Sequence, residues 1–143
     1  MNLFVLGDDC ISIVHGSKNV EATNITCGPG HGISIGSLGA GKSKEFVSEV
    51  TVNGAKISGT KNGVRIKTWP DSAVQISNVL YQNIIGKSAS DVAVKFDCSE
   101  KFPCKEIALE NIDLQYDEGE DAKALCNSVE LFYTGHVTPR CYS

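Results

Sequence analysis

Short runs of alternating apolar residues recur along the chain, and they constrain its fold more than any other feature. One set consists of Ile11-Ser-Ile13, Ile33-Ser-Ile35, Val64-Arg-Ile66 and Val92-Ala-Val94. A second set, interleaved with the first, consists of Val20–Cys27, Val50–Ile57, Val74–Ile85 and Ile107–Leu114. Within either set the runs repeat about every 22 to 33 residues, with no amphipathic helix between them, which predicts a solenoid.

A parallel β-helix accounts for this repeat. Each coil would supply two or three short strands that pair with their counterparts in the next coil, and alternate residues would point into a continuous apolar core. Asn, Ser and Gly between the runs would form the turns. The predicted fold class is therefore an all-β, right-handed, single-stranded parallel β-helix, with residues 1–143 as one domain. The alternative is a β-sandwich, which also contains many short strands.

Four asparagines lie close to strands of the second set: Asn24, Asn78, Asn83 and Asn111. They could stack as an internal ladder of amide side chains, or they could be ordinary turn residues. Asn24-Ile-Thr26 is also a sequon for N-glycosylation.

The first residues of the chain suggest that it is incomplete at the N-terminal end. Met1–Leu6 has neither the basic region nor the length of a signal peptide. Leu3–Leu6 would begin directly in a strand, whereas a solenoid needs a cap over its exposed core. We therefore expect preceding coils, and we expect the segment from Cys126 to Cys141 to close the other end.

Six cysteines favour disulfides over a metal site. Neighbours along the chain suggest Cys10–Cys27, Cys98–Cys104 and Cys126–Cys141, although six cysteines allow fifteen pairings. No CxxC motif and no His/Cys cluster with the spacing of zinc ligands occurs. Disulfides imply an oxidising compartment and hence secretion.

The formal net charge of −4 is unevenly distributed. Residues 1–71 contain seven Lys/Arg and six Asp/Glu, whereas residues 72–143 contain six and eleven. The absence of a basic stripe argues against a nucleic-acid partner, and no apolar run is long enough to cross a membrane. An anionic ligand should bind in the first half, and we expect a monomer.

Three polar motifs flank runs of the first set. Gly7-Asp8-Asp9 offers two adjacent carboxylates, which could serve as general acid and general base because their pKa values would separate. His31 lies between glycines in Gly28-Pro-Gly-His-Gly32 and could orient a carboxylate. As an alternative, either motif alone could be an ordinary turn without a functional role. We interpret His15 and His136 as structural or solvent-exposed.

Arg65 and Lys67 are two residues apart and therefore project from the same face of a strand. Two cations on one face repel each other unless an anion lies between them, so the pair predicts a carboxylate-binding site. A solvated polar face is the alternative. If the first-set runs stack, Ser12, Ser34 and Arg65 form one outer column, and the strand must bend at Gly7–Cys10 for both aspartates to reach one cleft.

These motifs resemble the signatures of plant polygalacturonases, members of glycoside hydrolase family 28. Gly7–Ile13, Gly28–Leu38 and Asn62–Lys67 are similar to the family's second, third and fourth motifs. Lys95–Cys104 and Val137–Cys141 resemble the C-terminal region of the exo-acting, pollen-type members. The resemblance covers essentially the whole chain.

The resemblance implies a pectin lyase-like β-helix that hydrolyses α-1,4-galacturonosyl linkages in pectin with inversion, secreted to the cell wall, without a metal or cofactor. By motif, Asp8 would donate a proton to the leaving oxygen and Asp9 would help activate water. His31 would orient Asp8, and Arg65 and Lys67 would bind galacturonate carboxylates.

Two departures from the family pattern open alternatives. The first motif, Asn-Thr-Asp, has no counterpart before Gly7, so we expect one water-activating aspartate to be missing. A tyrosine that some members carry after the fourth motif has no clear counterpart near Phe96-Asp97. A catalytically impaired pectin-binding remnant is therefore a second hypothesis, and a chain that does not fold alone is a third.

Overall fold

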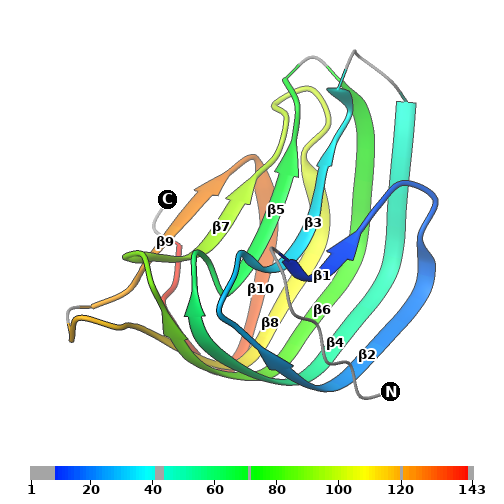
Figure 1. Ribbon diagram of the computed structural model, residues 1–143. Helices are drawn as coiled ribbons and strands as arrows, with labels where there is room; N and C mark the ends of the chain where they lie inside the picture. The colour runs from blue at the N-terminus through cyan, green and yellow to red at the C-terminus, as the bar shows by residue number, and fades with distance from the viewer. Residues whose placement is uncertain (1–8, 41–43, 71, 120, 142–143) are drawn as a thin grey trace.

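The computed structural model describes residues 9–40, 44–70, 72–119 and 121–141. The strands in this part of the chain form two five-stranded sheets, in the orders β1-β3-β5-β7-β9 and β10-β8-β6-β4-β2 (Figure 1). Within each sheet, every pair of neighbouring strands is parallel. The strands are β1 (Asp9–Ile13), β2 (Lys18–Cys27), β3 (Gly32–Leu38), β4 (Lys44–Thr60), β5 (Val64–Thr68), β6 (Ala73–Ser88), β7 (Val92–Asp97), β8 (Cys104–Tyr116), β9 (Lys123–Asn127) and β10 (Val129–Thr138).

This arrangement confirms the parallel β-helix and excludes the sandwich. Odd-numbered strands form one sheet and even-numbered strands the other, so the chain alternates between the two sheets and each strand pairs with the strand one coil away. Paired residues of adjacent coils are separated by 22 (Ile11 to Ile33) to 31 (Ile33 to Val64) positions in the sequence. An antiparallel sandwich would instead pair strands in both directions.

Apolar residues stack between the sheets because strand register places like positions side by side. Ile33 pairs with Ile11 on one side and with Val64 on the other, and all three are buried. The fourth run, Val92-Ala-Val94, lies in β7 of the same sheet as expected, but it is Val94 and not Val92 that pairs with Val64. Ala93 and Val94 are both fully buried, so the alternation on which the prediction depended breaks at this point.

The second sheet curves because its long strands bend at residues that have a left-handed backbone conformation and stack from coil to coil. Asn24, Gly54, Asn83, Asn111 and Gly135 all have positive φ. The registers on either side of them bring these five positions to the same level of successive coils. Gly and Asn tolerate this conformation best, so one bend repeats from coil to coil. Figure 1 shows the resulting curvature of β2, β4, β6, β8 and β10.

An amide ladder follows this bend, on the outside of the molecule. The Asn83 amide donates to Asn53 Oδ1 at 2.9 Å, and the Asn111 amide donates to Asn83 Oδ1 at 3.2 Å. The prediction of an internal ladder is therefore wrong in its location, because Asn83 and Asn111 are exposed. It also missed Asn53, and Asn78 belongs to a different bend.

Three disulfides fasten the coils, as neighbours along the chain suggested. Cys10–Cys27 joins β1 to the end of β2, and Cys98–Cys104 closes the turn between β7 and β8. Cys126–Cys141 joins β9 to the segment after β10. Within the part of the chain that the structure covers, no helix has the length and apolar character needed to span a membrane.

Tyr81 is a fully buried residue whose hydroxyl lacks a hydrogen-bond partner among the described residues. Its ring stacks on Phe96 with 5.8 Å between centroids, and burial raises the pKa of the hydroxyl. We expect Tyr81→Phe to stabilise the protein by about 1 kcal/mol, because it removes a desolvated donor without changing the ring packing. Thermal and urea unfolding would measure this change.

Tyr133 provides the matched control, since its hydroxyl accepts a hydrogen bond from the Cys141 backbone N–H at 2.9 Å. Tyr133→Phe should lower the free energy of unfolding by about 1 kcal/mol. A loss of stability in Tyr81→Phe similar to that in Tyr133→Phe would contradict the assignment of an unpaired hydroxyl.

Candidate active site

The sheet β1-β3-β5-β7-β9 contains the described residues that the sequence singled out for function. Asp9 begins β1, His31 immediately precedes β3, and both Arg65 and Lys67 lie on β5. Adjacent strands of a sheet lie about 4.8 Å apart, so motifs that are far apart in sequence become neighbours. Asp8 lies outside the described residues, so its predicted role stays a prediction.

The start of β1 has irregular register. Asp9 pairs with Gly32, but the next partners are Ile11 and Ile33, so the register shifts at Cys10. Cys10 and Ile11 are both buried and Cys10 is tied to Cys27, which interrupts the simple alternation of faces. The sequence predicted a bend at Gly7–Cys10, and the described part of this segment, Asp9–Cys10, contains an irregularity. The backbone therefore brings Asp9 next to the segment that carries His31.

The glycines around His31 allow the next coil to approach closely. The Lys61 and Asn62 backbone N–H groups donate to the carbonyl oxygens of Gly30 and His31, at 2.8 and 3.1 Å. A Cβ on Gly32, whose φ is +108°, would collide with the Asn62 carbonyl oxygen. These contacts fix the backbone of the loop, while the His31 side chain is exposed.

Ser12, Ser34 and Arg65 stack in register, as the sequence predicted. The column is not uniformly exposed, however, because Ser34 is 0% exposed whereas Ser12 is exposed. A small side chain in the middle of a sheet can be covered completely by its neighbours. Arg65 Nη2 donates to Ser37 Oγ at 3.4 Å, a contact at the long end of hydrogen bonding.

Lys67 has an anionic partner within the chain. Its Nζ lies 2.8 Å from Asp97 Oδ2 across the β5–β7 pairing, and the two side chains are 25% and 29% exposed. Asn127 on β9 donates to the other carboxylate oxygen of Asp97 at 3.3 Å. Lys67, Asp97 and Asn127 therefore form a hydrogen-bonded row across three strands.

This row lowers the pKa of the Asp97 carboxyl. The hydrogen bond from Lys67 is the largest cause, and partial burial opposes it. The charge of Lys67, the Asn127 amide and the charge of Lys95 lower the pKa further. Since the pKa is depressed on folding, the stabilisation is present above the ordinary Asp pKa and is lost as the pH falls through the lowered value.

Sequence reasoning did not single out Asp97 and Asn127, because it gave no residue-by-residue register for the fourth run. With Val94 opposite Val64, Lys95 falls opposite Arg65 and Asp97 opposite Lys67. The signal was therefore present in the alternation Val94-Lys-Phe-Asp97, and correct register would have revealed it.

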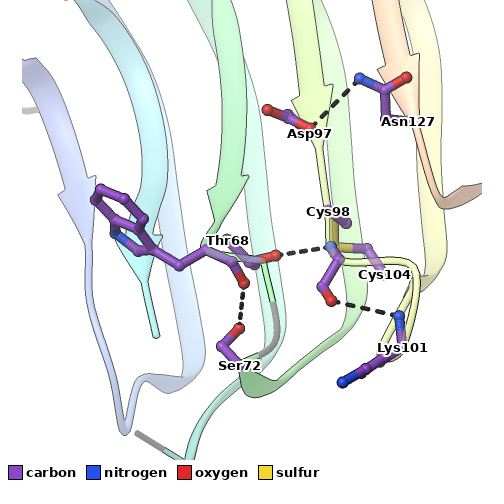
Figure 2. Close-up of a disulfide and its surroundings, with 9 residues drawn as sticks. Thr68, Ser72, Asp97, Cys98, Lys101, Cys104 and Asn127 are labelled. Atoms are coloured by element: carbon purple, nitrogen blue, oxygen red, sulfur yellow. Dashed lines mark hydrogen bonds between the residues drawn. A yellow bond between two sulfur atoms is a disulfide. The ribbon is translucent and has the colours of Figure 1, made fainter. Parts of the chain in front are cut away.

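A hollow of about 640 Å³ adjoins this row beyond the carboxyl ends of β5, β7 and β9. Lys67, Asp97, Lys101 and Asn127 are among its lining residues. Its wall is braced by the Ser99 backbone N–H, which donates to Thr68 Oγ1 at 2.9 Å, and by the disulfide Cys98–Cys104 (Figure 2). The hollow thus combines cationic and amide donors, which could receive a carboxylate or hydroxyl groups, with the carboxylates of Asp97 and Glu100.

No cluster of three or more His, Cys, Asp or Glu side chains capable of holding a metal ion occurs in the ranges that the structure covers.

The sequence profile of Glycosyl hydrolases family 28 matches this chain in two overlapping parts, residues 2–87 and residues 70–138. Together the matches cover nearly the whole chain. The chain belongs to glycosyl hydrolases family 28.

Relatives of this family 28 chain include plant proteins named as polygalacturonases. Polygalacturonase-2 of Solanum lycopersicum is 49% identical over 176 aligned positions, which cover 96% of this chain and 38% of that protein. Polygalacturonase QRT2 of Arabidopsis thaliana is 46% identical over 175 positions, covering 94% and 40%. An exopolygalacturonase of Oenothera organensis is 38% identical, covering 93% and 48%.

These matches confirm the resemblance to plant polygalacturonases that the motifs carried. The family 28 chain spans less than half the length of each of these three relatives. The exo-acting mode of attack stays a prediction.

Proposed function

We propose that this family 28 chain acts in the hydrolysis of α-1,4-galacturonosyl linkages in pectin, with inversion at the anomeric carbon. The observation that carries the proposal is the register of β1, β3 and β5, which sets Asp9, the His31 loop and Arg65 on consecutive strands. Membership of the family and the names of its plant relatives support the same chemistry. We also propose that the chain is the C-terminal part of a longer β-helix domain.

In the proposed reaction, two carboxyl groups divide the work. Asp8 gives a proton to the glycosidic oxygen as the bond to the anomeric carbon breaks, and Asp9 takes a proton from the water that attacks the opposite face. His31 orients the acid through a hydrogen bond, and the product has the inverted anomeric configuration. Paired carboxylates suit this reaction because one remains protonated while the other is ionised.

Arg65 and Lys67 hold the substrate in this proposal. Each galacturonate unit carries a carboxylate at mildly acid or neutral pH, and guanidinium and ammonium groups form strong charge-assisted hydrogen bonds to carboxylates. Both residues lie on the central strand β5 of the sheet, one strand from the His31 loop. The substrate would therefore cross the strands, contacting one coil after another.

We also propose that the protein acts outside the cell, in the wall where pectin occurs. The three disulfides support this location, because disulfides persist in oxidising compartments. Recovery of the natural protein from the cytosol with its cysteines reduced would contradict this location.

The test of function is release of reducing ends from polygalacturonate by the purified chain. We expect hydrolysis with inversion, which NMR of the newly formed anomeric centre would detect. We expect Arg65→Met to raise KM about tenfold with little change in kcat. Lys56→Met is the matched control, because Lys56 is an exposed cation on β4 in the other sheet. Binding of polygalacturonate without any hydrolysis would favour the pectin-binding remnant instead.

A further inference from the structure

The relatives carry internal residues that this chain lacks. The alignment with the tomato relative spans 176 positions, whereas the whole chain has 143 residues, so at least 33 positions (176 less 143) have no counterpart here. Alignments with the apple and Arabidopsis relatives span 175 positions. Paired residues of neighbouring coils in this structure are 22 (Ile11 to Ile33) to 31 (Ile33 to Val64) residues apart. The difference is therefore about the size of one coil.

The match to the family is itself divided within this chain. Residues 70–87 belong to both the first and the second match, so no single continuous match runs through this range. This range covers the end of the turn after β5 and nearly all of β6. A difference of one whole coil here would preserve the inward and outward alternation, since each coil of a solenoid contacts only its neighbours.

In this chain β5 and β7 are direct neighbours, and their register brings Lys67 opposite Asp97. Lys67 Nζ and Asp97 Oδ2 are 2.8 Å apart, and Asn127 holds the second carboxylate oxygen. The Asp97 carboxylate thus presents to Lys67 the same chemical group that a galacturonate unit would present.

We propose that Asp97 is an internal competitor for the carboxylate of the substrate, occupying the Lys67 ammonium in the free protein. The inference rests on the proposed function, which gives Lys67 the role of binding galacturonate. Asp97 determines affinity in this view, because the substrate must displace it from Lys67. The neighbouring hollow, lined by Lys101 and Asn127, is where the displacing carbohydrate would lie.

Two features favour competition over a purely structural ion pair. Both partners remain partly exposed, at 25% and 29%, so a soluble carboxylate can reach the ammonium. Asp97 also borders the hollow itself and does not face the apolar core, which at this level is formed by Phe96 on the same strand.

The experiment compares Asp97→Asn with Asp91→Asn by calorimetric titration with trigalacturonate. Asp91 forms an ion pair with Lys123 at 3.2 Å. Each variant therefore removes one solvent-accessible ion pair and one negative charge. We expect Asp97→Asn to bind trigalacturonate about three- to tenfold more tightly than the wild type, and Asp91→Asn to bind like the wild type. The gain should disappear in Lys67→Met/Asp97→Asn.

Equal affinity of Asp97→Asn and Asp91→Asn, or weaker binding by Asp97→Asn, would overturn the inference. As a second measurement, NMR titration of the Asp97 carboxyl in the wild type should show its pKa rising when trigalacturonate is added; an unchanged pKa would also overturn it. These readouts do not require hydrolysis. Tighter binding by Asp97→Asn without turnover would support Asp97 as a competitor and refute the catalytic proposal. Turnover with no effect of Asp97→Asn on binding would support the catalytic proposal and refute the competitor.

Discussion

Gly32→Ala should destabilise the β-helix by about 4 kcal/mol or more and abolish any hydrolysis of polygalacturonate. Gly32 has φ +108°, a conformation that L-residues avoid, and an added Cβ would overlap the Asn62 carbonyl oxygen of the next coil. That carbonyl belongs to the backbone and cannot rotate away as a flexible side chain would. The two coils would have to separate, which would break the hydrogen bonds that hold the His31 loop.

Circular dichroism during thermal and urea unfolding would measure the loss of stability. Gly119→Ala is the matched control, because Gly119 also has positive φ, at +81°, but an added Cβ would meet no atom within 4 Å. It should cost about 1 kcal/mol, from backbone conformation alone. If both variants unfolded alike, the close approach of the coils would not be what requires glycine at position 32.

The glycines of the Gly28–Gly32 motif have a structural role that the motif itself does not reveal. Glycine is also required where a backbone closely approaches a ligand. The structure instead brings the backbone of the next coil against Gly28 and Gly32, through Ser58 and Asn62. Sequence alone cannot distinguish these uses, because both require a residue without a side chain.

The coil architecture was predictable because the apolar residues repeat with the period of the coil and alternate within each strand. Burying Ile33, Ile35 and Ile66 on one face leaves only parallel pairing between equivalent runs. Disulfide partners were suggested for a related reason, since consecutive cysteines fall on segments that one turn of the chain brings together.

Local departures from alternation were not predictable from the same pattern. Ala93 and Val94 are both buried, and the register shifts between Val92 and Val94. A shift of this kind changes which polar side chains face each other across strands, so the Lys67–Asp97 pair escaped prediction. Ser34 was expected on the surface from its parity, but its burial depends on neighbouring coils that the parity of one strand does not describe.

Asp9→Asn should lower kcat for polygalacturonate about 10²- to 10⁴-fold while changing KM much less. The substitution keeps the shape of the side chain and removes its capacity to accept a proton from water. Asp9 pairs with Gly32 at the edge of the proposed site, so its backbone position is held by the neighbouring coil and should survive the change. Initial rates of reducing-end release, measured at several substrate concentrations, would separate kcat from KM.

Ser12→Ala is the matched control for Asp9→Asn, because Ser12 is an exposed polar residue on the same strand β1. It should retain the wild-type kcat, which would show that a loss in Asp9→Asn does not come from disturbing the strand. The pH dependence provides a second criterion: a base that acts in its ionised form gives the acid limb of a bell-shaped kcat profile, and that limb should be absent from the residual activity of Asp9→Asn. A wild-type kcat with both limbs intact in Asp9→Asn would mean that Asp9 is not the base, and that the paired-carboxylate mechanism does not apply to this chain.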